Sequence, residues 1–131
     1  MLVEELLANY IGAKNGDFND LSLFDFVGVY VIYEKNTKEV VYIGSAYARN
    51  IKKRLSQYVS PSDTGNTLGK TIAKTLSGSE TYDDNAKLQI KNAVNMIKDK
   101  FAIIAIPHED LEYKLIKDIN PKYNNKGKAE D

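Results

Sequence analysis

The pattern of apolar and polar residues divides the chain into short strands separated by helices. Three dense apolar runs, rich in β-branched and aromatic residues, are typical of buried strands. These runs are VGVYVIY at residues 27–33, VVYIG at 40–44 and FAIIAI at 101–106. Because only the polar link EKNTKE separates the first two runs, they are predicted to form a β-hairpin.

Apolar residues at intervals of three and four predict helices in the remaining segments. The predicted helices span residues 2–10, 50–59, 67–76, 83–100 and, from Glu109 or Asp110, to about Asp118. In the last helix Glu112 borders the apolar stripe, so its carboxylate is expected to be half-buried. A half-buried carboxylate usually has a partner, such as an arginine or a cation.

These elements predict one α/β (α+β) domain over residues 1–131, a three-stranded antiparallel sheet flanked by helices. Residues 1–25 are predicted to form an N-terminal helix and the segment that leads into the sheet. Residues 60–100 exceed what a minimal core needs, which predicts a helical insertion between the first core helix and the third strand. The polar tail at residues 125–131 is predicted to be frayed.

Two tyrosines of the predicted hairpin, Tyr30 and Tyr42, can share one face of the sheet only in certain registers. Side chains alternate along each strand, so the numbers of paired residues must sum to an even value. A loop with an odd number of residues meets this condition. We expect the loop Lys35–Thr37, with Asn36 in the left-handed conformation that asparagine tolerates.

Composition excludes several classes of function. The chain has no cysteine and one histidine, so disulfides and thiolate metal sites are excluded. A Ser-His-Asp arrangement is not present, and a hydrolase of this sequence would need another base, for which the tyrosines are candidates. The N-terminus does not resemble a signal peptide and the longest apolar run is too short to span a bilayer. We therefore expect a cytoplasmic protein with no membrane partner.

Charge is balanced overall but uneven along the chain. There are 18 basic and 18 acidic residues, which argues against strong non-specific binding to polyanions. Residues 49–54 nevertheless contain four basic and no acidic residues, whereas residues 1–25 contain five acidic residues and one lysine. A locally basic face on a neutral molecule is enough to bind phosphates. A solvated helix surface would explain the same residues.

Two motifs carry a resemblance to a known family. GVY at residues 28–30 is followed by YIG at 42–44 and then by a helix with Arg54. Far downstream, LEYKLIKDINPKYN at residues 111–124 has a helix with a glutamate, then proline and asparagine. In this order the motifs resemble those of the GIY-YIG nuclease family. The resemblance implies the GIY-YIG fold and hydrolysis of phosphodiester bonds in DNA.

The resemblance also implies a metal site and a base. Glu112 would hold one divalent cation per active site, Mg²⁺ or Mn²⁺, both of which prefer oxygen ligands. Tyr30, the first motif tyrosine, would act as general base on the attacking water. An unperturbed tyrosine has a pKa near ~10, so Tyr30 would need the cation and Arg54 nearby to work at neutral pH.

Further site residues follow from the same resemblance. Arg54 would clamp the phosphate, although the link after YIG is long enough that Arg49 is the alternative. Tyr42 and Tyr58 would orient water or phosphate through their hydroxyl groups. Asn124 is expected to tie the C-terminal segment to the site rather than to take part in chemistry.

DNA is the expected partner, and basic side chains near the site are the expected contacts. The candidates are Arg49, Lys52, Lys53, Lys70 and Lys74. The apolar residues Leu68, Ile72 and Leu76, with the helix after Asp83, predict a surface on which a homodimer could form. Two other functions fit the sequence: a catalytically inactive DNA-binding module of the same fold, and an unrelated interaction domain in which the motif residues are ordinary core.

Overall fold

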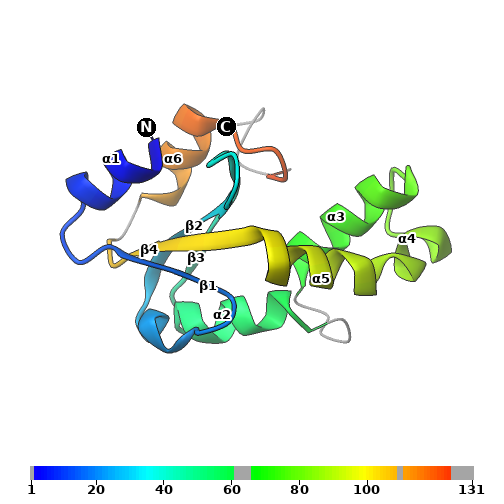
Figure 1. Ribbon diagram of the computed structural model, residues 1–131, viewed down its shortest axis with the longest axis horizontal. Helices are drawn as coiled ribbons and strands as arrows, with labels where there is room; N and C mark the ends of the chain where they lie inside the picture. Colours follow the sequence, from blue (N-terminus) through cyan, green and yellow to red (C-terminus); the bar gives the residue numbers. More distant parts are fainter. Residues whose placement is uncertain (1, 61–65, 109–110, 125–131) are drawn as a thin grey trace.

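The computed structural model describes residues 2–60, 66–108 and 111–124 and has an α+β fold around an antiparallel sheet (Figure 1). The sheet has four strands in the order β1-β4-β2-β3. The strands are β1 (Lys14–Asp17), β2 (Gly28–Glu34), β3 (Val40–Ala46) and β4 (Phe101–Ile106). Every residue of β4 is buried, as are the first six of β2. Burial on both faces explains their continuous apolar sequences.

The prediction of a three-stranded sheet was wrong because β1 carries no strand signal. Its sequence, KNGD, is polar and contains a glycine, and it pairs only with β4, from Lys14 opposite Ala105 to Asp17 opposite Ala102. As an edge strand it is half-exposed, so the apolar alternation that marks a strand is missing. Pairing with a fully buried neighbour, not its own sequence, makes this segment a strand.

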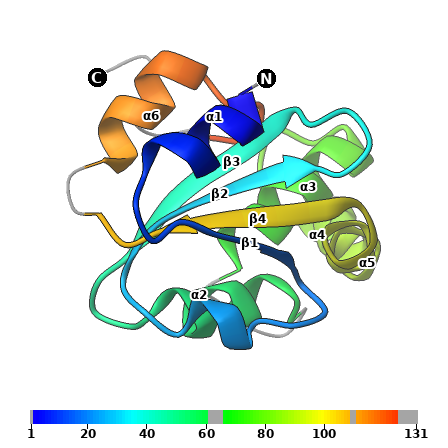
Figure 2. The ribbon, with the colours of Figure 1, turned by 60° about the vertical axis from the view of Figure 1, so that its left-hand side comes forward.

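Helices cover both faces of the sheet (Figure 2). They are α1 (Leu2–Asn9), η1 (Ser22–Phe24), α2 (Ile51–Tyr58), α3 (Thr67–Ser77), α4 (Asp84–Leu88), α5 (Ile90–Lys100) and α6 (Glu112–Ile119). One core joins the sheet to α1 and α6, and the other joins it to α2, α3 and α5. Within the described ranges, no helix has the length and apolar character needed to cross a membrane.

The segment between α2 and β4 differs from its prediction at two places. Residues 83–100 form two helices that meet at Gln89, not one. Leu88 and Ile90 are two apart, so they cannot share one helix face, and Leu88 is 78% exposed. Leu68 and Ile72, predicted to offer a dimer surface, are fully buried in the core, while Leu76 is exposed. The apolar surface expected for a dimer is therefore mostly interior.

The hairpin places Tyr30 and Tyr42 on the same face, as predicted. Tyr30 pairs with Gly44 and Ile32 with Tyr42, so the paired numbers have an even sum. The predicted loop, however, was wrong. The backbone N–H of Glu34 donates to the carbonyl of Glu39 around the turn, and Lys38, not Asn36, is left-handed, with φ 65°. The register shifts beyond Ile32, and this irregularity sets the even sum.

Candidate active site

Three tyrosines and one arginine form a cluster on the face of the sheet that α2 covers. Tyr30 Oη and Tyr58 Oη are hydrogen-bonded at 2.5 Å. The Tyr58 ring meets the rings of Tyr30 and Tyr42 edge to face, with 5.9 Å between centroids in each pair. The Arg54 guanidinium lies 5.1 Å from the centre of the Tyr58 ring. The structure thus brings together four of the predicted site residues.

Gly44, in the YIG run, provides the space that Tyr30 occupies. The two residues are paired across the hairpin. A Cβ atom at residue 44 would collide with the hydroxyl group and the ring of Tyr30. A glycine in a strand interior often marks such a close approach. The position of the Tyr30 ring therefore depends on the absence of a side chain at residue 44.

Burial distinguishes the three tyrosines. Tyr30 is 1% exposed and Tyr58 is fully buried, whereas Tyr42 is partly exposed. Desolvation raises the pKa of each phenol, and the charge of one neighbouring tyrosine raises it further, although the hydrogen bond from Tyr58 lowers the pKa of Tyr30. The positive charge of Arg54 acts in the opposite direction and lowers the pKa of all three. The net shift is upward, so each phenol keeps its proton at neutral pH in this state.

Helix α2 places Arg54 in this cluster. Ile51 and Leu55 bury the apolar face of the helix, and Arg54 and Tyr58, four residues apart, lie together beside it. Arg54 Nη1 donates to Gln57 Oε1 at 2.8 Å, and Nη2 donates to Thr67 Oγ1 at 3.5 Å. Arg49, the alternative predicted from the sequence, lies before α2 and is exposed.

Glu112 comes from α6, on the other face of the sheet. The Ser45 hydroxyl donates to Glu112 Oε1 at 2.7 Å. Ser45 pairs with Val29, so it points to the face that α6 covers. Glu112 is half-buried, as its place beside the apolar stripe predicted. The carboxylate is therefore held near the exposed edge of β3.

A cleft at this edge connects the two faces. It has a volume of about 450 Å³, and Tyr42 and Glu112 both line it. Thr67 also lines it and lies 3.4 Å from Tyr42 Oη, so the Thr67 hydroxyl contacts both Tyr42 and Arg54. Tyr42 and Glu112 thus face the same cleft. Arg54 is one hydrogen bond from a residue that lines the cleft.

Asn124 ties the C-terminal segment to the edge of β3. Its Oδ1 accepts from the N–H of Ile43 at 2.8 Å, and its Nδ2 donates to the carbonyl of the same residue at 2.9 Å. The backbone N–H of Tyr123 donates to the carbonyl of Val41 at 2.8 Å. These bonds satisfy backbone groups that an edge strand leaves unpaired. This is the structural role expected for Asn124 from the sequence.

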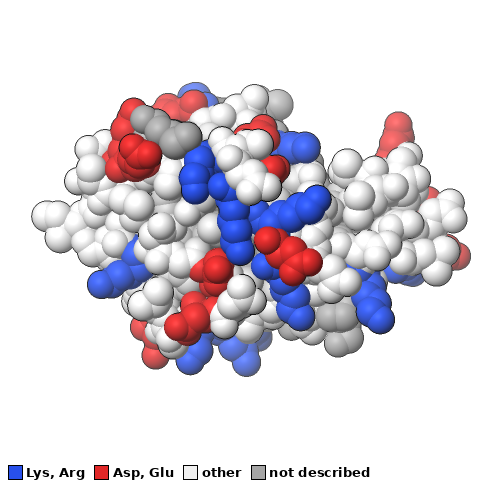
Figure 3. All heavy atoms as spheres, viewed as in Figure 1, with Lys and Arg blue, Asp and Glu red and all other residues white. Residues whose placement is uncertain are grey.

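The basic residues predicted to contact DNA fall into two groups. Lys70 and Lys74 of α3 line the cleft. Arg49, Lys52 and Lys53 are exposed at the start of α2. On the face seen in Figure 3, Lys and Arg side chains are interspersed with Asp and Glu, in keeping with the balanced charge. The predicted frayed tail, residues 125–131, and the predicted helix start at Glu109 or Asp110 lie outside the described residues.

Comparison of the sequence with models of known families shows to which family the chain belongs. The family model of the GIY-YIG catalytic domain matches residues 26–124, from the segment before β2 to the asparagine that ties β3. The chain belongs to this family. Neither the search of curated proteins nor that of solved structures gave a match. Membership of the GIY-YIG family makes this a domain of the nuclease type, with the Tyr30–Tyr42–Arg54–Tyr58 cluster and Glu112 on the matched stretch.

Three residues that contact the candidate site residues were not predicted from the sequence: Ser45, Gln57 and Thr67. Ser45 had a usable signal, since strand alternation assigns it to the face opposite Tyr42 and Gly44, where α6 packs. Gln57 is three residues after Arg54, a spacing at which helical side chains meet. Thr67 had no comparable signal, because its contacts with Tyr42 and Arg54 join elements far apart in the sequence.

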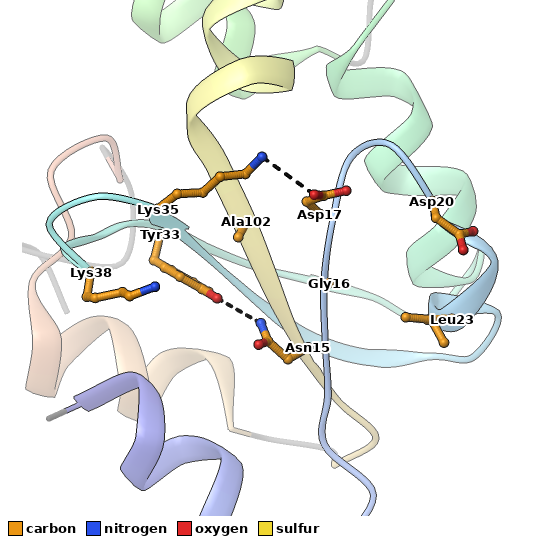
Figure 4. A pocket seen from close by; sticks show the side chains of 9 residues that line it. All are labelled: Asn15, Gly16, Asp17, Asp20, Leu23, Tyr33, Lys35, Lys38 and Ala102. Carbon is orange, nitrogen blue, oxygen red and sulfur yellow. Dashed lines mark hydrogen bonds and ion pairs between the residues drawn. The ribbon is translucent and has the colours of Figure 1, made fainter.

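A second hollow, of about 440 Å³, lies at the β1 end of the sheet and has a different character (Figure 4). Asn15 Nδ2 donates to Tyr33 Oη at 2.8 Å and to the carbonyl of Ile103 at 2.9 Å. Lys35 Nζ lies 3.5 Å from Asp17 Oδ2. Four of its polar side chains are thus paired with one another, and Tyr33 is only 4% exposed.

Proposed function

We propose that this domain is a metal-dependent DNA endonuclease that hydrolyses phosphodiester bonds in the cleft beside β3. The observation that carries the proposal is the shared cleft of Tyr42 and Glu112, with Arg54 bonded to Thr67 on its wall. A phenol, a carboxylate and a guanidinium can together move a proton, hold a cation and bind a phosphate. Membership of a nuclease family supports the same reaction.

The donor set fits one divalent cation held by Glu112. Among the residues that the structure describes, no cluster of three or more His, Cys, Asp or Glu side chains could enclose a metal. Mg²⁺ does not need such a cage, because it is usually held by one or two carboxylates, waters and substrate phosphates. The Ser45 hydroxyl orients Glu112 through Oε1. When bound, the cation would stabilise charge on the scissile phosphate and lower the pKa of a nearby phenol.

Burial favours Tyr42 over Tyr30 as the residue that accepts the proton of the attacking water. A general base must reach the water within hydrogen-bond distance, and the Tyr30 side chain is 1% exposed. Tyr42 is partly exposed and lines the cleft with Glu112. In the proposed reaction a water oxygen bonds to phosphorus and gives its proton to the Tyr42 phenolate, whose formation the bound cation would favour. The bond from phosphorus to the leaving oxygen breaks, and that oxygen takes a proton from solvent. Tyr30 would instead act through the groups that it contacts.

Arg54 would bind the phosphate, and Tyr58 would position Arg54. A planar guanidinium suits bidentate contact with phosphate oxygens better than an ammonium does. Tyr58 is fully buried, so it meets the substrate only through its neighbours. Its ring lies under the Arg54 guanidinium and its hydroxyl bonds to Tyr30. These contacts support a positioning role for Tyr58 and Tyr30 rather than contact with water.

The proposal is tested by incubating supercoiled and linear DNA with the protein, with and without Mg²⁺. Wild-type protein is expected to nick DNA only with Mg²⁺. Glu112→Gln keeps the size of the side chain and removes its charge, so the fold should survive. Loss of one preorganised electrostatic group lowers the rate by roughly 10²–10³. A variant that keeps more than about a tenth of wild-type cleavage, well short of that loss, would refute the metal assignment.

Asp118→Asn is the matched control for this experiment. Asp118 lies on the same helix, and its carboxylate is 3.7 Å from Lys114 Nζ in an exposed pair. This change should leave cleavage intact. Wild-type protein that binds DNA but never cuts it would favour the inactive DNA-binding module instead.

A further inference from the structure

One face of α3 forms a wall of the catalytic cleft. Thr67, Lys70, Thr71 and Lys74 all line the cleft. Their spacing of three, four and seven residues puts them on one side of the helix. The other side, with Leu68, Ile72 and Ala73, is buried in the core. This fixes the rotation of α3, so the two lysines are held on the cleft side by packing.

An aromatic ring restrains the first of these lysines. Lys70 Nζ lies 5.4 Å from the centre of the Tyr82 ring. Tyr82 comes from the segment between α3 and α4, packs partly against the core and lines the same cleft. An ammonium near the face of an aromatic ring is attracted by the quadrupole of the ring. Tyr82 therefore favours conformations in which the Lys70 ammonium stays at the cleft.

The wall begins at the catalytic residues and leads away from them. Thr67, at its first turn, contacts both Tyr42 and Arg54. Lys74 is seven residues further along, about 10 Å at ~1.5 Å per residue. That length exceeds the spacing of successive phosphates on one strand, so the wall can contact more than one phosphate. Phosphates next to a scissile phosphate held at Arg54 would lie along this wall.

We propose that α3 binds the backbone phosphates that flank the scissile phosphate, through Lys70 and Lys74, with Tyr82 as a positioning residue for Lys70. The inference rests on the proposed function, because it takes the scissile phosphate to be bound beside Thr67. Thr71 contributes less, since its hydroxyl already donates to the carbonyl of Thr67 at 2.9 Å. The cleft volume of about 450 Å³ admits a short stretch of one strand, not a whole duplex.

This mode of binding predicts no base preference from α3. Lysine contacts to phosphates fix the position of the strand but do not read its sequence. They do make affinity depend on salt, because each neutralised phosphate releases counterions. The expected slope of log K against log salt is about −0.7 per phosphate on a single strand and −0.9 on a duplex.

The test measures this slope with the Glu112→Gln protein, which isolates binding from cleavage. A labelled single-stranded oligonucleotide is titrated over a range of salt concentrations, without divalent cations. Adding Lys70→Gln or Lys74→Gln should each make the slope less negative by about 0.7. Lys91→Gln and Lys98→Gln, at exposed positions of α5 in the same segment of the chain, are matched controls and should leave the slope unchanged. Equal effects from the α5 variants would overturn the proposal.

Two variants of Tyr82 test the positioning role. Tyr82→Phe keeps the ring and should behave as the parent protein does. Tyr82→Leu removes the ring and should reduce the slope, but not when Lys70→Gln is already present. Additive effects of Tyr82→Leu and Lys70→Gln would show that Tyr82 does not act through Lys70.

The outcome separates this inference from the proposed function. If wild-type protein cleaves DNA but the α3 lysines do not change the slope, the inference fails and the endonuclease stands. If wild-type protein does not cleave but the slope falls as expected, the proposed chemistry fails while the phosphate-binding wall stands.

Discussion

The two ends of the sheet carry hollows of similar size that differ in how their polar groups are used. The cleft beside β3 is about 450 Å³ and the hollow beside β1 about 440 Å³. Each is lined by at least one tyrosine, two lysines and a carboxylate. At β1 the polar groups bond to one another, as in the Lys35–Asp17 pair and the bond from Asn15 to Tyr33.

At the β3 edge the polar groups instead come from elements on both faces of the sheet. Glu112 arrives from α6 on one face, and α3 arrives from the other with Thr67 and the two lysines. Tyr42 packs against Tyr58, whose ring contacts the Arg54 guanidinium. Residue types and volume are alike at the two ends, so they do not identify the site. What differs is that the polar groups of the β3 cleft come from helices on both faces of the sheet.

The largest expected difference between the two ends is in the effect of removing a phenol hydroxyl. Tyr42→Phe should lower the rate of DNA cleavage by at least about 10²-fold, the usual contribution of a general base. Tyr33→Phe, at the β1 end, should leave cleavage unchanged and cost roughly 1 kcal/mol of folding free energy for its lost hydrogen bond. The nicking assay and urea denaturation measure the two effects. Similar cleavage by both variants would remove the distinction between the two ends.

A smaller effect is expected from the Arg54 guanidinium, which is bonded to Thr67 on the cleft wall. Arg54→Ala should weaken DNA binding and lower cleavage, because the positive charge and the planar donors are both lost. Arg49→Ala, at an exposed position before α2, should reduce cleavage far less. Cleavage rates at saturating DNA measure the loss of catalysis. DNA binding by the same arginine variants, made in the Glu112→Gln protein, measures the loss of affinity. The opposite ranking would assign the phosphate contact to Arg49.

The buried cluster behind the cleft predicts sensitivity to alkaline pH. The pKa values of Tyr30, Tyr42 and Tyr58 are raised in the folded protein, first by desolvation. In the unfolded chain the three phenols lose their protons above the ordinary tyrosine pKa of ~10, while the folded protein retains them. Stability is therefore complete below about pH 10 and falls as pH rises above it, by up to ~1.4 kcal/mol per pH unit for each phenol.

Tyr58→Phe tests this linkage by removing one of the titrating groups. Above about pH 10 the free energy of unfolding of the variant should fall less steeply with pH, by the slope that one titrating proton contributes. At neutral pH it should be less stable by roughly 1–3 kcal/mol, because the buried Tyr30 hydroxyl loses its hydrogen bond with Tyr58. Chemical denaturation from pH 8 to 11 gives both quantities. An unchanged alkaline slope would mean that Tyr58 ionises equally in both states.

The smallest effect is expected at the β1 end. Asp17→Asn breaks a partly exposed ion pair with Lys35, and such pairs contribute about 0–1 kcal/mol. Cleavage should be unaffected. A loss of cleavage comparable to that of Tyr42→Phe would mean that the hollow at β1 takes part in function.

The sequence by itself determined the strands and helices that build the site. Continuous apolar runs identify β2 and β4 because both faces of these strands are covered. The half-burial of Glu112 follows from helix periodicity, which local geometry fixes. Strand alternation limits the shared face of Tyr30 and Tyr42 to registers with an even sum, but the irregularity beyond Ile32 sets that register. The order of the GVY, YIG and closing motifs was enough to indicate the family.

Tertiary structure decided which of these residues meet solvent. The hairpin register assigns Tyr30 and Tyr42 to one face, and packing of α2 against that face buries Tyr30 and leaves Tyr42 in the cleft. A tyrosine fits either environment, because its ring is apolar and its tip is polar, so sequence alone could not choose between the two. The polar strand β1 and the partners Thr67 and Ser45 likewise depend on neighbours supplied by distant segments. Such contacts leave no local periodic signal.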